Sequence, residues 1–208
     1  LPVRKITCPC EQVFNADIPE KVDLDQDTDA LDKLMDGSLL SCICPTCNAE
    51  LNLDLPLTVS WPSRKATIVM VPEMERLALV SGTLSPKKNA MYVVGYAELA
   101  DRTAVLRDGL EPVVIEALKY RLLQKAKETD PQKNPVAFYE KRDESGELEF
   151  HIHGIRETEV AVTRIPSRLY DSILGDWKAN PDREDYTALH VGSYLSVRNI
   201  LLEDSSDA

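Results

Sequence analysis

Two short cysteine motifs near the start of the chain have the residue types and spacing of a metal site. The motifs are Cys8-Pro9-Cys10 and Cys44-Pro45-Thr46-Cys47, and each places two thiols in a tight turn. Zinc prefers four soft ligands in a tetrahedron, and two turns from separate hairpins supply that geometry. One structural Zn2+ per chain is therefore predicted. Its expected ligands are Cys8, Cys10, Cys44 and Cys47.

The distribution of the cysteines favours metal binding over disulfide formation. All five lie within the first 47 residues, and four form close pairs separated by the stretch 11–43. This spacing is typical of metal ligands in a reducing compartment, so a cytoplasmic location is expected. The alternative is a set of free buried thiols, which the short Cys8-Pro9-Cys10 motif keeps open because its knuckle must be distorted.

The fifth cysteine, Cys42, lies two residues before Cys44. On a strand, the two side chains would point to the same face. Cys42 is either a substitute ligand or a small core residue, and the sequence favours the core residue.

Several segments together resemble the bacterial CpXC family, which is named for paired Cys-Pro-Xaa-Cys motifs. The resemblance covers roughly residues 4–128 and implies a zinc ribbon without an established biochemical activity. The first motif departs from the family pattern because it lacks the residue between Pro9 and Cys10. The matching segments are Ile6-Thr7-Cys8-Pro9-Cys10 with Phe14, Asp36-Gly37-Ser38-Leu39, the second cysteine motif, and Leu106 through Lys119.

The pattern of apolar residues predicts an α+β protein. An N-terminal zinc-ribbon β unit (about 1–61) is inserted on a mixed α/β region, and together they form a CpXC-like domain at 1–129. A small antiparallel β-rich C-terminal unit with a helix follows at 130–202, and residues 203–208 are expected to be a disordered tail.

Individual elements follow from local signals. Helices are expected where apolar residues recur at helical spacing, and strands where they alternate or run together. The main expected strands are 4–8, 13–18, 39–43, 51–55, 66–71, 91–96, 136–141, 148–155 and 159–165. The expected helices include 98–106, 112–128 and 168–177, and 194–201 is a final helix or strand.

A second possible metal site lies on the expected strand through His151 and His153. Alternation places Glu149, His151 and His153 on one face, and His-Xaa-His on a strand is a common donor pair for transition metals. The ordinary interpretation, a solvent-facing polar face of a sheet, explains the same pattern and is favoured. A metal-dependent enzyme using His151 and His153 stays as the alternative function.

Composition limits the partners. The chain has 24 Lys and Arg against 35 Asp and Glu, which gives a net charge of −11. Such a surface repels phosphate backbones and anionic lipids, so neither nucleic acid nor membrane is an expected partner. No apolar run approaches the length of a bilayer span, and the start lacks the apolar core of a signal peptide.

These observations favour a non-catalytic, zinc-stabilised scaffold or adaptor that binds another protein. No nucleophile elbow, dinucleotide fingerprint or kinase signature occurs in the sequence. A nucleic-acid-binding zinc ribbon is the further alternative, and the acidic charge disfavours it.

Overall fold

The computed structural model describes residues 2–84, 87, 89–156 and 158–203. The described chain forms two compact units, Leu1–Ala100 and Asp101–Ala208, with the division inside helix α3 (Gly95–Arg107). Helices and strands alternate through both units, which confirms the α+β class. The domain boundary expected near residue 129 stays a prediction.

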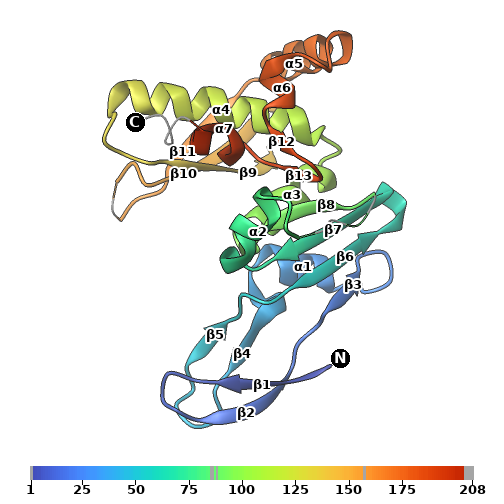
Figure 1. The fold of residues 1–208 in the computed structure, drawn as a ribbon, viewed down its shortest axis with the longest axis vertical. Helices are drawn as coiled ribbons and strands as arrows, with labels where there is room; N and C mark the ends of the chain where they lie inside the picture. Colours follow the sequence, from blue (N-terminus) through green and yellow to red (C-terminus); the bar gives the residue numbers. More distant parts are fainter. Residues whose placement is uncertain (1, 85–86, 88, 157, 204–208) are drawn as a thin grey trace. The chain divides into compact units, whose positions relative to one another are not determined.

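The N-terminal part of unit 1, here called the ribbon, consists of two small antiparallel hairpins. In Figure 1 their strands are the blue arrows at the end of unit 1 that contains the N-terminus. Each hairpin ends in a turn that carries one cysteine motif. The strands are β1 (Val3–Thr7) paired with β2 (Val13–Asp17), and β4 (Ser41–Ile43) paired with β5 (Glu50–Asn52).

Unit 1 also contains four strands that hydrogen-bond in the order β8-β7-β6-β3. The pairs β3–β6 and β7–β8 are parallel, and β6–β7 is antiparallel. Alternate residues of β6 are buried, as expected for a strand with one face on the core. The bounds are β3 (Lys21–Asp23), β6 (Leu57–Trp61), β7 (Ala66–Val71) and β8 (Met91–Val94).

Short helices connect these strands. Helix α1 lies between β3 and β4, and α2 lies between the parallel strands β7 and β8, where a crossover connection is required. The bounds are α1 (Ala30–Met35), η1 (Ser38–Leu40), η2 (Pro62–Arg64), η3 (Glu73–Glu75) and α2 (Arg76–Val80).

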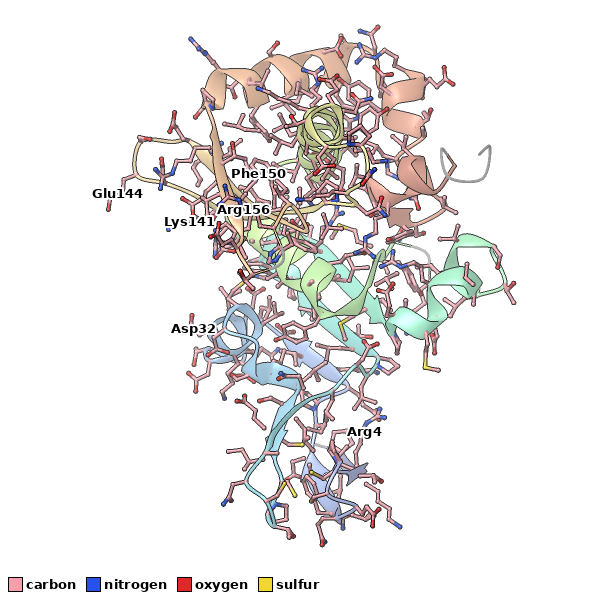
Figure 2. All side chains as sticks on the ribbon, turned by 90° about the vertical axis from the view of Figure 1, so that its left-hand side faces the viewer. Arg4, Asp32, Lys141, Glu144, Phe150 and Arg156 are labelled. Carbon is pink, nitrogen blue, oxygen red and sulfur yellow. The ribbon has the colours of Figure 1, made fainter. Side chains whose placement is uncertain are left out.

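Unit 2 packs a long helix, α4 (Pro112–Thr129), against a three-stranded antiparallel sheet in the order β11-β10-β9. Helix α4 contacts β9, β13, α5 and α6. Figure 2 shows Phe150 inside this unit, where its ring meets that of Tyr139 edge-on at 5.5 Å. The other bounds are β9 (Val136–Arg142), β10 (Leu148–His153), β11 (Ala161–Ile165), α5 (Ser167–Ala179), α6 (Glu184–Thr187), β12 (His190–Val191), β13 (Tyr194–Leu195) and α7 (Arg198–Glu203).

Four charged side chains lie inside the core of unit 2 and form what we call the charged core. Its members, Asp101, Arg102, Glu116 and Lys119, are each at most 5% exposed. Lys119 Nζ donates to Asp101 Oδ2 at 2.5 Å and to Glu116 Oε1 at 2.9 Å. Arg102 Nη2 donates to the same Glu116 oxygen at 3.2 Å. Two positive and two negative charges therefore balance within one cluster.

Backbone groups extend this network. The Tyr139 N–H donates to Asp101 at 2.5 Å, and the Val197 N–H donates to Glu116 at 2.9 Å. Arg102 donates to the Leu195 carbonyl at 2.9 Å. Since buried charges need partners to offset their desolvation, the charged core holds β9 and the segment after β13 against α3 and α4.

Most expected elements occur close to their expected positions. Strands β3 and β6 of the sheet in unit 1 were not expected, and the expected strand 51–55 is replaced by the shorter β5. Only the end of the expected strand 39–43 is extended, because η1 occupies Ser38–Leu40 after Gly37, whose φ of +89° suits glycine. The final segment contains both β13 and α7. Of the expected disordered tail, Glu203 ends α7, and residues 204–208 lie outside the described residues.

Candidate metal centre

The first cysteine turn connects β1 to β2. The Cys8 N–H donates to the Gln12 carbonyl at 2.9 Å, and the Glu11 N–H donates to the Cys8 carbonyl at 2.8 Å. Glu11 has a φ of +69°, a left-handed conformation that turns the chain back sharply. The turn therefore holds Cys8 and Cys10 on a short, doubly hydrogen-bonded loop.

The second cysteine turn, between β4 and β5, has a similar plan. The Cys44 N–H donates to the Ala49 carbonyl at 2.9 Å, and the Asn48 N–H donates to the Cys44 carbonyl at 3.0 Å. Asn48 has a φ of +57°, and asparagine tolerates this conformation better than most residues.

The two cysteine turns share a hydrogen-bond plan that also accommodates the shorter first motif. In both turns, the residue after the second cysteine has a positive φ and donates to the carbonyl of the first cysteine. The two bonded residues are four positions apart in the second turn, Cys44 and Asn48, and three positions apart in the first turn, Cys8 and Glu11. The missing residue shortens the loop by one position and leaves both thiols on it.

The two turns bring four sulfur atoms together. The Sγ atoms of Cys8 and Cys47 are 3.6 Å apart, and those of Cys10 and Cys44 are 3.7 Å apart. All four sulfurs lie within 4.8 Å of one another. Zn–S bonds of about 2.3 Å at tetrahedral angles require S–S distances of about 3.8 Å. The four cysteines could therefore hold a metal ion.

Backbone groups around the sulfurs favour thiolates unequally. The N–H groups of Cys47 and Thr46 lower the pKa of the Cys44 thiol to about 6. The Cys10 N–H also favours the Cys8 thiolate, but burial and the neighbouring thiols raise the pKa of Cys8 to about 12. A thiolate at every position requires a cation among the sulfurs, since crowded negative charges repel one another.

Exposure divides the four cysteines into inner and outer pairs. Cys8 and Cys44, the first cysteine of each turn, are buried, whereas Cys10 and Cys47 are exposed. Cys42 is half-buried on β4, opposite Leu51, and does not belong to the four-sulfur group. Burial raises the pKa of the Cys42 thiol, so this residue has the environment of a packing residue.

The histidine strand is arranged differently from the expected flat polar face. A register shift between β9 and β10 leaves Glu140 unpaired, and His151 lies between two carboxylates. Its Nε2 is 3.4 Å from Glu149 Oε1, and its Nδ1 is 3.8 Å from Glu140 Oε2. Glu149 is buried, and Arg164 of β11 binds its carboxylate at 3.0 Å. His153 is exposed, and its ring meets that of Phe138 edge-on at 5.8 Å.

Within the described part of the chain, the cysteines are the one group of three or more Cys, His, Asp or Glu ligand atoms brought together at metal-site distances. Neither His153 nor His151 with its two neighbouring carboxylates forms such a group there. No helix of the described residues has the length and apolar character needed to cross a membrane.

The charged core was not predicted from the sequence. Its signal is visible in retrospect: Glu116 and Lys119 are three residues apart inside the apolar run of α4, where charges are unexpected. Glu–Lys pairs at this spacing are also common on exposed helix faces, so the spacing alone does not place this pair in the interior.

Comparison with known proteins assigns the family. The pattern described as "CpXC protein" matches residues 6–119, which is more than half of the chain. The chain belongs to the CpXC family. An uncharacterised protein of Treponema pallidum (strain Nichols) is 29% identical over 217 residues, an alignment that covers 96% of this chain and 99% of the relative. No solved structure is significantly similar.

Proposed function

We propose that this chain is a non-catalytic protein-interaction scaffold whose ribbon is stabilised by one structural zinc ion. The observation that carries the proposal is the group of four thiol sulfurs within 4.8 Å, supplied by two turns of similar design. Zn2+ is the metal for which four cysteine ligands are an ordinary complete coordination shell. Its ligands are Cys8, Cys10, Cys44 and Cys47.

The ligand set supports a structural role for the metal. Catalytic zinc sites keep a position open for water or substrate, whereas four thiolates fill a tetrahedron. The two hairpins that carry the ligands have only three to five residues per strand. Hairpins of this size are marginal by themselves, so the metal supplies folding free energy in the ribbon.

A protein partner fits the charge better than a nucleic acid does. The net charge of −11 opposes the approach of a phosphate backbone. Because free thiolates and their zinc survive best in a reducing environment, we infer a cytoplasmic location.

The first test of this proposal is the metal content. Full-length protein purified without added metal should contain about one zinc per chain by elemental analysis. Metal-free protein with five free thiols and a folded ribbon would contradict the structural zinc.

The second test concerns the scaffold role. Tagged full-length chain, recovered from cells that naturally produce it, should retain one partner protein in a fixed ratio after stringent washing. The tag alone is the control. Absence of any enriched protein would contradict the scaffold role, whatever the metal content.

A further inference from the structure

The four gathered cysteines differ in whether a dissolved molecule can reach them. Cys10 and Cys47, the second cysteine of each turn, are exposed, whereas Cys8 is 3% exposed and Cys44 is fully buried. The Sγ atom of Cys47 is 3.6 Å from that of Cys8, and the Sγ atom of Cys10 is 3.7 Å from that of Cys44. Both contacts therefore join an exposed cysteine of one turn to a buried cysteine of the other.

The short first motif limits which of these sulfurs can bond to each other. A disulfide tolerates only a narrow range of geometry. In the first turn one residue, Pro9, separates the two cysteines, and its ring fixes the backbone φ. Hydrogen bonds from the Cys8 N–H to Gln12 and from the Glu11 N–H to Cys8 hold this loop further. A disulfide within the first turn would be strained, so the suitable partners of its sulfurs lie on the other hairpin.

The second turn has no such limit, since two residues separate its cysteines as in redox-active Cys-Xaa-Xaa-Cys motifs. A bond between Cys44 and Cys47, however, would leave Cys8 and Cys10 with only each other as partners. Two unstrained disulfides from four thiols therefore require bonds between the turns. The two contacts at 3.6 Å and 3.7 Å provide them, as Cys8–Cys47 and Cys10–Cys44.

We propose that the four cysteines also form a peroxide-responsive switch, in which the zinc is exchanged for disulfides Cys8–Cys47 and Cys10–Cys44 between the two hairpins. This inference rests on the zinc site of the proposed function and adds its regulation. A thiolate binds zinc and a disulfide sulfur does not, so oxidation releases the metal. The new bonds keep the hairpins joined. Disulfides of cytosolic proteins are usually transient and redox-sensing, which agrees with the proposed location.

The oxidant is hydrogen peroxide, which reaches the exposed cysteines first. The Cys10 thiolate attacks one peroxide oxygen, so that an S–O bond forms, the O–O bond breaks, and hydroxide leaves and is protonated to water. The Cys44 thiolate then attacks the Cys10 sulfur of this sulfenic acid, the S–S bond forms, and the S–O bond breaks with loss of a second water. Two thiols lose two electrons and one peroxide gains them. Cys47 and Cys8 react in the same way.

The test uses the zinc-loaded full-length chain and a chromogenic zinc chelator. Titration with hydrogen peroxide should release one zinc per chain while two peroxides are consumed, because each disulfide uses one. Mass spectrometry of unreduced peptides, fragmented between Pro9 and Cys10, should find Cys8–Cys47 and Cys10–Cys44. Dithiothreitol with added zinc should restore the starting metal content, since disulfide formation is reversible.

Two variants isolate the cause. Cys42→Ser removes the thiol outside the four-sulfur group and should release zinc and form both disulfides like the wild type. Insertion of one threonine after Pro9 gives the first turn the length of the second. Disulfides within each turn should then become the main products. Bonds between the turns as the main products of this insertion variant would overturn the role of the short motif.

Hydrogen exchange tests whether the disulfides hold the ribbon. The oxidised, zinc-free chain should exchange backbone amides of β1 and β4 at least about tenfold more slowly than chain that is reduced and stripped of zinc by a chelator, because the cross-links restrict the unfolded state. Equal exchange in the two zinc-free forms would overturn the proposed tie between the hairpins.

The outcomes separate the switch from the zinc site. If the chain contains no zinc before peroxide is added, the proposed structural zinc fails and the switch fails with it. If zinc is bound but peroxide does not release it, the switch is overturned and the structural zinc stands. The same holds if zinc release yields only Cys44–Cys47, bonds between separate chains, or sulfinic acids.

Discussion

The ribbon and the charged core each bring four polar side chains together, but the two clusters differ in exposure and in charge balance. In the ribbon, four sulfurs meet on two small hairpins, and Cys10 and Cys47 are exposed. In unit 2, four ionised groups meet inside a helical core and balance one another's charge. Four thiolates in the ribbon would share one sign of charge and would need an added cation, whereas the charged core contains its own cations.

The two regions differ in the source of their stability. The ribbon has strands of only three to five residues, so the proposed zinc would couple metal binding to folding there. Unit 2 buries an extensive apolar core around α4, and its ion pairs lie within that core. Buried ion pairs are weak sources of net stability but are costly to break. Removing one partner should therefore damage unit 2 even though the pairs do not drive its folding.

The largest expected effect is loss of the ribbon when its metal site is broken. Cys44→Ser removes a fully buried ligand and should abolish zinc retention, with exchange of backbone amides in β1, β2, β4 and β5 rising by orders of magnitude. Helix α4 of unit 2 should keep its protection. Elemental analysis and hydrogen exchange read by mass spectrometry measure both effects.

Cys42→Ser is the matched control for this ligand. It should retain zinc and cost only packing, because Cys42 lies outside the sulfur group. Zinc loss in Cys42→Ser together with zinc retention in Cys10→Ser would show that the fourth ligand is misassigned.

The next effect concerns the charged core. Lys119→Met should destabilise the protein by about 3–5 kcal/mol, because it leaves the carboxylates of Asp101 and Glu116 buried without their shared cation. Urea unfolding followed by a probe in unit 2 measures the change. Lys125→Met, at an exposed position on the same helix, should change the free energy of unfolding by less than about 0.5 kcal/mol. Equal effects of the two variants would contradict the importance of the buried pairs.

A smaller, pH-dependent effect is expected at Asp108, a second polar anchor in unit 2. Partial burial favours the neutral acid, but hydrogen bonds from Arg107, the Tyr139 hydroxyl and the Arg142 N–H hold the pKa of Asp108 below its ordinary value. A lowered pKa in the folded state stabilises the protein above the unfolded-state pKa of about 4. That stability is lost as the pH falls through the folded-state pKa.

Tyr139→Phe tests this anchor. Loss of the hydroxyl donor should raise the pKa of Asp108 toward its ordinary value and cost about 1–2 kcal/mol at pH 7, with a smaller cost near pH 2. NMR titration of the Asp108 carboxyl and urea unfolding at both pH values measure the two quantities. An unchanged pKa of Asp108 in Tyr139→Phe would count against the hydroxyl as its donor.

The smallest effect is expected at the histidine strand. The double change His151→Ala with His153→Ala should leave the zinc content at its wild-type value, because neither residue belongs to a described group of ligands at metal-site distances. The cost in stability should stay within about 1 kcal/mol. Loss of a second equivalent of bound metal would instead favour the metal-dependent enzyme and give unit 2 a metal site of its own.

The ribbon could be predicted from sequence to a large extent because its signals are local. Paired cysteines in Pro-containing turns, and the apolar positions of the flanking strands, are visible over a few residues. The same is true of α4, where Pro112 begins an apolar stripe at helical spacing. The CpXC resemblance, supported over residues 6–119, added the family and the expectation of zinc, but no reaction.

The register shift in the β9–β10 hairpin could not be predicted in this way. Strict alternation expects Glu149 and His151 on one solvent face, but Glu140 is left unpaired and Arg164 covers Glu149. The sequence of one strand does not show where the side chains of the neighbouring strands lie. Burial of a residue in a sheet therefore depends on contacts made far along the chain.

The sequence alone determined the α+β class, the identity of the four gathered cysteines and most element positions, because these depend on residue type and short-range periodicity. The tertiary structure decided three things that local pattern does not carry. It set the distances between the sulfurs of two separate hairpins. It placed Asp101, Arg102, Glu116 and Lys119 together inside a core, and it turned Arg76 inward so that Met74 and Leu77 face solvent. Each depends on packing between segments that are distant in the sequence. That packing decides which side chains are neighbours and whether a side chain is buried or exposed.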